Sequence, residues 1–262
     1  MVRDSAAVST WVFLRGLTRE SRHWGSFPET FRQALPKAEV HAIDLPGNGR
    51  LHRQKSPLDV AEMAESCRAQ LLASGIPPPY HVLAMSLGAM VTIAWAAHHP
   101  EEIRGCVLIN TSLRPFNPFH QRLKPGNYLP LLKPLLTGAS AAHWERTILQ
   151  LTSRHATHPT ALLKDWTAFR TEYPVSFGNA CRQLLAAARY RAPFKQAATP
   201  MLVLASTADG LVDPCCSREL AARWRTAFAE HPTAGHDIPL DDGPWVARQV
   251  SDWLRRPGQS SS

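Results

Sequence analysis

The stretch YHVLAMSLGAMVTIAWAAH, residues 80–98, decides the fold. Its first five residues form an apolar run that predicts a buried strand, and the apolar part from Leu87 onward predicts a helix. Between them the motif AMSLG (84–88) places Ser86 on a tight turn from strand to helix. Such a turn, called a nucleophile elbow, exposes the hydroxyl of its serine. A serine in this place can also be a plain helix N-cap, and that alternative stays open.

The rest of the chain alternates predicted strands with predicted helices. Strands are predicted at 11–14, 40–43, 106–109 and 199–204, and helices at 24–35, 57–72, 214–228 and 244–254. This alternation is typical of a parallel sheet with right-handed crossover connections. Residues 113–195 interrupt it with four helical patterns and no evident strand. We therefore predict an α/β core formed by 1–112 and 196–262, and a helical insertion formed by 113–195.

Composition limits the class of protein. The chain has 262 residues, of which 44% are hydrophobic and 19% charged, as in an ordinary globular protein. It has no run of about 18 apolar residues that would predict a membrane span, and its first ten residues lack the apolar core of a secretory signal. The five cysteines, an odd number that includes the neighbouring Cys215 and Cys216, favour reduced thiols over a disulfide framework. These features predict a cytoplasmic protein.

The positive charge is concentrated in the predicted insertion. The formal net charge is +8, and residues 113–193 contain eleven Lys or Arg against three Asp or Glu, which leaves 18 of each sign elsewhere. A local field of this size favours an anionic substrate or an acidic partner such as a carrier protein, although solubility alone would also explain it. The basic residues are interleaved with leucines and no recognition motif accompanies them, so we expect no nucleic-acid partner.

A nucleophilic serine needs a base and an orienting carboxylate. His236, in the segment AGHD (234–237), precedes the last predicted helix. Asp209 follows the predicted strand 199–204 and is our choice of carboxylate, with Asp213 as its rival. The carboxyl ends of parallel strands meet at one edge of a sheet, where we expect these loops to come together. Surface histidines and Asp-Gly turns are the ordinary alternatives.

The negative charge that develops during acyl transfer needs backbone donors. The N–H of Leu87, next to the serine, is one candidate. The N–H of Leu17 is the second, because it lies in the loop after the strand 11–14 and Gly16 permits a sharp turn there.

These segments resemble the α/β-hydrolase superfamily, together with Trp24 and the turn DLPGNG (44–49). Within it, the chain is similar to small bacterial carboxylesterases with a helical lid, including enzymes that demethylate pimeloyl-carrier-protein methyl ester. The resemblance implies a mostly parallel eight-stranded sheet, with the insertion as a four-helix lid over the site. The chain departs from the family at two positions. Arg15 replaces a histidine that is mainly structural in the family, and Ala84 replaces the first glycine of the elbow.

Several residues are candidates for contact with substrate. Arg15, Gly16, Trp144 and Trp166 are the ones we select. The apolar residues of the insertion that could line an acyl pocket are Tyr128, Leu129, Leu131, Leu132, Leu135, Leu136, Trp144, Leu149, Trp166 and Phe169. Most of these residues would serve equally well to pack the insertion onto the core.

The function that the sequence favours is hydrolysis of small-molecule carboxylic esters or thioesters through an acyl-enzyme on Ser86. One alternative is hydrolysis of a C–C bond in a diketone with the same three residues. Another is a non-catalytic ligand-binding protein, an alternative that Arg15 leaves open. No CxxC, HExxH or GxGxxG motif is present, so we expect neither a metal nor a dinucleotide cofactor.

Overall fold

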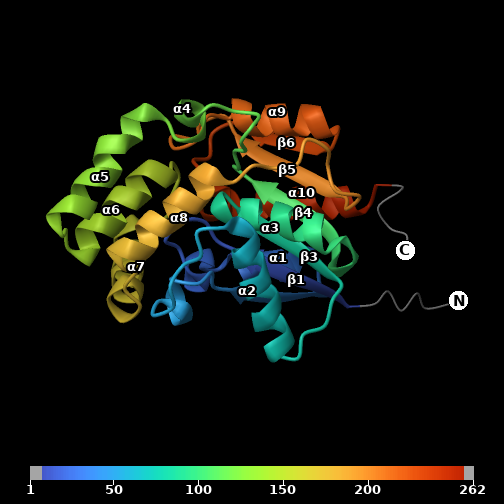
Figure 1. The fold of residues 1–262 in the computed structure, drawn as a ribbon, viewed down its shortest axis with the longest axis horizontal. Coiled ribbons are helices and arrows are strands. Elements are labelled where there is room, and N and C mark those ends of the chain that lie inside the picture. The colour runs from blue at the N-terminus through green and yellow to red at the C-terminus, as the bar shows by residue number, and fades with distance from the viewer. Residues whose placement is uncertain (1–7, 257–262) are drawn as a thin grey trace, which may run out of the picture.

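The computed structural model describes residues 8–256, apart from the side chains of Pro134 and Leu135. Its central sheet is parallel, with the strand order β2-β1-β3-β4-β5-β6 (Figure 1). The strands are β1 (Ser9–Leu14), β2 (Ala38–Ile43), β3 (Tyr80–Met85), β4 (Ile103–Ile109), β5 (Met201–Ser206) and β6 (Ala227–His231). The expected parallel α/β sheet is confirmed, but the expectation of eight strands is wrong, because residues 8–256 form six.

Helices cover both faces of the sheet. One face carries α2 (Val60–Ala73), α3 (Leu87–His98) and α9 (Cys215–Trp224), and the other carries α1 (Phe27–Ala34) and α10 (Ile238–Leu254). Side chains of β1 alternate between the two layers, with Val12 in one core and Phe13 in the other, and both are fully buried. A parallel strand covered on both faces is apolar throughout, which is why the β1 segment reads as a continuous apolar run.

The sheet reverses its order between β1 and β3. The chain runs from β1 outward to β2 and then returns to place β3 on the other side of β1. In open α/β sheets ligands bind beyond the carboxyl ends of the strands at such a switch point. The loop that follows β1 and the turn that follows β3 therefore meet where a site is expected.

The sixth strand is the part of the core that sequence patterns missed. The predicted helix 214–228 ends at Trp224, and Arg225 then takes a left-handed conformation with φ 51°. The next residues form β6 at the edge of the sheet, where it pairs with β5. With a sequence of AFAEH and no apolar run, β6 carries little of the pattern that predicts a buried strand.

The helical insertion, residues 113–195, connects β4 to β5 and lies to one side of the sheet (Figure 1). Its helices are α4 (Phe119–Arg122), α5 (Tyr128–Thr137), α6 (Ala141–Thr152), α7 (Pro159–Glu172) and α8 (Phe177–Arg189). Its two ends are joined by a β-bridge between Arg114 and Arg191, and the Ala192 N–H donates to the Arg114 carbonyl at 2.7 Å. None of the helices in residues 8–256 combines the length and the apolar character needed to cross a membrane.

Candidate active site

Ser86 lies on the turn between β3 and α3. Its φ of 52° and ψ of −115° are unusual for a residue with a side chain. The Ser86 N–H donates to the Ile109 carbonyl at 3.0 Å, and the Thr111 hydroxyl donates to the Ser86 carbonyl at 3.3 Å. The Ser86 hydroxyl makes no capping hydrogen bond to α3, so the plain N-cap alternative does not describe it. Strain held in place by neighbouring bonds is typical of a functional position.

Two glycines let the loop after β1 lie against this turn. A Cβ on Gly88 would lie 2.6 Å from the Arg15 carbonyl oxygen, and a Cβ on Gly16 would lie 3.1 Å from the Ser86 Cβ. Gly88 has no room for a side chain, and a side chain at Gly16 would require the Ser86 side chain to shift. Ala84, in contrast, is fully buried in β3 and its methyl group packs in the core. The alanine at the start of the elbow is therefore accommodated.

His236 and Asp209 form a buried pair. His236 Nδ1 lies 2.7 Å from Asp209 Oδ2, and the two residues are 5% and 2% exposed. Asp209 Oδ1 accepts the N–H groups of Leu211 at 2.7 Å and Val212 at 2.9 Å. Both carboxylate oxygens are thus occupied, which fixes the orientation of the carboxylate toward His236.

The rival Asp213 has a different role. Its side chain accepts the N–H of Cys215 at 2.9 Å, at the start of α9. That hydrogen bond lowers the pKa of the Asp213 carboxyl. Asp213 is engaged by the helix N-terminus, and Asp209 is the carboxylate that faces His236.

Asn110 holds the histidine loop in place and was missed by sequence analysis. Its Nδ2 donates to the His236 carbonyl at 2.7 Å, and its Oδ1 accepts the Ser206 N–H at 3.0 Å. Its φ of 47° is one that asparagine tolerates better than most residues. A polar residue directly after the predicted strand 106–109 was the available signal.

Arg15 is joined to the same loop. Its guanidinium forms two hydrogen bonds to Asp237, of 3.2 and 2.5 Å, and a third contact of 3.2 Å to Met85 Sδ. Both charged side chains are buried, at 5% and 3% exposure. Met85 and Asp237 are neighbours of Ser86 and His236 in sequence. Arg15 therefore ties the segment before the serine to the segment after the histidine.

A cavity of about 390 Å³ opens over these residues. Its floor includes Ser86, His236, Leu17, Leu87, Arg15 and Gly16. Its walls come largely from the helical insertion, including Tyr128, Leu131, Leu132 and Trp144. The lining is mainly apolar, which suits an acyl chain.

The other apolar candidates of the insertion lie elsewhere. Trp166, one of the predicted substrate contacts, is buried and does not line the cavity; the Arg19 guanidinium lies 4.0 Å from its ring centroid. Leu149 is buried outside the lining, Leu129 and Leu136 are exposed, and Phe169 lines a separate small pocket. The side chain of Leu135 lies outside the described residues.

Several cations of the insertion bind backbone carbonyls. Arg122, Lys124, Arg154 and Arg182 donate to the carbonyls of Ala187, Asp209, Ala208 and Ser56. Three of these four bonds cross from the insertion to the core, and two of them reach the segment that holds Asp209. Part of the concentrated positive charge therefore has a structural role.

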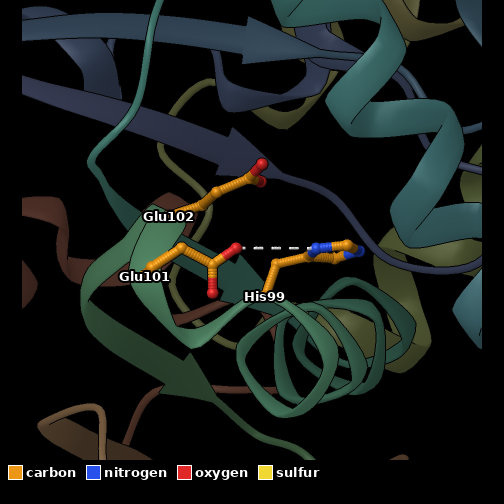
Figure 2. Close-up of side chains that lie close together, drawn as sticks. All are labelled: His99, Glu101 and Glu102. Carbon is orange, nitrogen blue, oxygen red and sulfur yellow. Dashed lines mark ion pairs between the residues drawn. The ribbon is translucent and has the colours of Figure 1, made fainter.

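A separate group of potential metal ligands lies at the opposite end of α3 from Ser86, about 18 Å away for a helix of this length. The ligand atoms of His99, Glu101 and Glu102 lie within 4.8 Å of one another (Figure 2). His99 Nε2 is 2.6 Å from Glu65, and Arg68 donates to both Glu102 oxygens, at 2.8 and 2.5 Å. The hydrogen bonds from Arg68 lower the pKa of Glu102. The group is accounted for as a surface network of ion pairs.

Comparisons with known proteins agree with this architecture. The chain is 35% identical over 92 residues to the pimeloyl-[acyl-carrier protein] methyl ester esterase of Chromobacterium violaceum, covering 35% of this chain and 34% of that protein. It is 34% identical over 89 residues to the enzyme of the same name from Neisseria meningitidis, covering 32% of each. The matched segment spans about a third of these relatives.

Solved structures show the same fold over most of the chain. A thermophilic esterase from Thermogutta terrifontis superposes with a TM-score of 0.71 at 18% identity, covering 95% of this chain and 90% of that one. A lipase-esterase related protein from Clostridium acetobutylicum gives 0.72 at 12% identity, covering 95% of both chains. The family model described as alpha/beta hydrolase fold matches residues 12–243. The chain therefore belongs to the α/β hydrolase fold family.

Proposed function

We propose that the protein is a serine hydrolase that cleaves carboxylic esters or thioesters. The observation that carries the proposal is the 2.7 Å contact between His236 and Asp209, beside an apolar cavity lined by both His236 and Ser86. The two curated relatives described above are named methyl ester esterases, and these names support an ester as the substrate.

In the proposed first step, Ser86 Oγ attacks the acyl carbonyl. His236 Nδ1 is engaged by Asp209, so Nε2 is the nitrogen that takes the serine proton. Asp209 then stabilises the positive charge on the imidazolium. Protonated His236 passes this proton to the leaving alcohol or thiol, and an acyl-enzyme ester on Ser86 remains.

The oxyanion is held by backbone donors in this proposal. Leu87 is the first residue of α3, so its N–H has no carbonyl one turn earlier to bind. The N–H of Leu17 is its partner, in the loop that Gly16 brings against Ser86. In the second step His236 removes a proton from water as the water oxygen attacks the acyl carbonyl. The bond from the acyl carbon to Ser86 Oγ then breaks, His236 returns the proton to Oγ, and the acid is released. No cofactor takes part in either step.

The helical insertion acts as a lid in this proposal. It supplies most of the apolar wall, with Trp144 and the Arg15–Gly16 segment as the substrate-contacting groups that we select. Exposed cations that remain on the insertion, such as Lys133 and Arg146, would attract an anionic substrate or an acidic carrier protein. Raising the ionic strength should then raise KM and leave kcat unchanged. A flat response to salt would remove the electrostatic part of the proposal.

Labelling with a fluorophosphonate probe tests the nucleophile. We expect the wild type to be labelled and Ser86→Ala to lose the label. Ser112→Ala is a matched control, because Ser112 lines the same cavity and should not carry the label. Folded wild-type protein that takes no label would contradict the proposed mechanism. A diketone assayed beside simple esters separates ester from C–C bond hydrolysis.

A further inference from the structure

Arg19 brings a positive charge to the wall of the cavity. Its side chain is 7% exposed, and Nη1 donates to the buried carboxylate of Glu145 at 2.5 Å. The same carboxylate binds Arg170 Nε at 3.2 Å. One acid thus serves two guanidinium groups, and the three side chains carry a net charge of +1. A buried charge without a full counter-charge is costly unless a ligand supplies one.

The cavity lining also contains hydrogen-bond donors that lack acceptors. Five of its residues hold a buried side-chain atom without a partner, namely Arg15 Nε, Thr18 Oγ1, Arg19 Nη2, Arg122 Nε and Trp144 Nε1. Every one of these groups can donate a hydrogen bond. A ligand that carries acceptor oxygens would satisfy such groups, whereas a plain hydrocarbon chain would leave them unpaired.

Three of these donors belong to Arg19 or to residues that adjoin the Arg19–Glu145 pair in sequence, and the guanidinium of Arg170 lies 4.8 Å from the centroid of the Trp144 ring. Thr18 precedes Arg19, and Trp144 precedes Glu145. Thr18 is a β-branched residue with a φ of 56°, a strained conformation held by the bond from its N–H to Gln183 Oε1 at 2.9 Å. This strained turn directly follows Leu17. The loop that holds the proposed oxyanion donor therefore continues directly into Thr18 and Arg19.

The other two arginines of the lining already have negative partners. Arg15 shares its charge with Asp237 in a buried pair. Arg122 donates to the carbonyls of Ala187 and Ala188, in the last turn of α8, where the helix dipole is negative. Arg19 is therefore the lining arginine whose counter-charge is shared with a second arginine.

We propose that Arg19, Thr18 and Trp144 form a subsite that binds a carboxylate of the substrate. This inference rests on the proposed function and makes it more specific. The favoured substrate is a half-ester of a dicarboxylic acid, in which one end of the acyl chain is esterified and the other is a free carboxylate. In this arrangement the ester end reaches Ser86, and the carboxylate binds the donors of Arg19, Thr18 and Trp144. These donors are already buried in the folded protein, so the cost of removing them from water is not part of the binding free energy.

The test compares the monoethyl ester of octanedioic acid with ethyl octanoate, at constant ionic strength. Charge-assisted hydrogen bonds should make kcat/KM of the wild type about 10- to 100-fold higher for the half-ester, mainly through KM. Arg19→Gln should reduce this ratio to near one, and Arg19→Lys should keep part of it. Glu145 retains Arg170 in Arg19→Gln, so the variant should fold, which its melting temperature checks. Arg248→Gln, which alters an exposed arginine on α10 outside the insertion, removes the same charge and should keep the ratio.

A wild type that hydrolyses both esters equally would overturn the subsite and leave the proposed function standing. The same conclusion would follow if Arg19→Gln weakened both substrates alike. Titration of the Ser86→Ala variant with octanedioate tests binding without turnover. Binding that Arg19→Gln abolishes would support the subsite even if no ester were hydrolysed, in which case the proposed function alone would fail.

Discussion

Arg15 and Asp237, which are 222 residues apart in sequence, form a buried ion pair with two hydrogen bonds. The pair connects the loop after β1 to the residue that follows His236. The loop after β1 contains the proposed oxyanion donor Leu17, so one interaction positions groups on two sides of Ser86. Position 15 is expected to be a histidine in the family that the chain resembles. In this chain it is an arginine, and Asp237 supplies the counter-charge.

Arg15→Met should destabilise the protein by about 3–5 kcal/mol, because it leaves the Asp237 carboxylate buried without its counter-charge. It should also lower kcat, since the histidine loop loses an anchor. Urea denaturation and steady-state kinetics measure the two effects. Adding Asp237→Asn should recover part of the loss in stability. Arg255→Met, which breaks an exposed pair with Asp252, should cost less than about 1 kcal/mol.

Asn110→Asp should lower kcat by about 10- to 100-fold with little change in KM, by analogy with other groups that orient catalytic residues. The aspartate tolerates the positive φ but loses the amide N–H that binds the His236 carbonyl. Circular dichroism checks that the variant is folded. An unchanged kcat in a folded variant would show that this hydrogen bond does not position the histidine.

Gly88→Ala should lower the free energy of unfolding by about 1–3 kcal/mol, because the new Cβ overlaps the backbone of Leu14 and Arg15. It should also displace the loop after β1 and lower kcat. Gly126→Ala is the matched control, since a Cβ there has no neighbour within 4 Å, and its stability should be near that of the wild type. Thermal unfolding of both variants decides the comparison.

Stability should fall as the pH drops from 6.5 to about 4, in part because of His81. This side chain is 8% exposed and stacks on Trp11, and burial lowers its pKa to about 4. In this range the unfolded chain binds a proton that the folded protein excludes, so acid favours unfolding by about 2–3 kcal/mol from this residue. His81→Phe should flatten the pH dependence of the unfolding free energy. An unchanged slope in that variant would contradict the assignment.

The sequence indicated where the candidate site lies because apolar runs in it mark the positions at which strands end. A polar residue that comes soon after an apolar run in a parallel sheet lies near the carboxyl edge of the sheet, as Ser86 and Asp209 do. The loop with His236 precedes the last helix and reaches the same edge. Their neighbourhood was predictable from order along the chain, whereas the 2.7 Å contact required the folded structure.

The residue roles that local sequence patterns could not predict depend on partners that lie far away in the chain. Arg15 acquires its role from Asp237, and Asn110 acquires its role from His236, 126 residues further along. The apolar residues of the insertion show the same limit. Leu131 lines the cavity, Leu129 faces solvent and Trp166 packs against Arg19, although all three suit a helix that covers an acyl pocket. The short, partly polar strand β6 was not predicted, because edge strands lack the burial on both faces that makes central strands apolar.

The bridge between Arg114 and Arg191 brings the two ends of the helical insertion together beside the sheet. Its entry and exit lie side by side, so a segment of different length could join β4 to β5 from the same two points. Laboratory exchange of residues 113–195 should therefore remodel the cavity wall without moving the strands, provided that the hydrogen bonds from Lys124 and Arg154 to the carbonyls of Asp209 and Ala208 are kept. Chimeras that receive the corresponding segment of a relative, with Lys124 and Arg154 retained, should have a new range of substrates and keep the contact between His236 and Asp209.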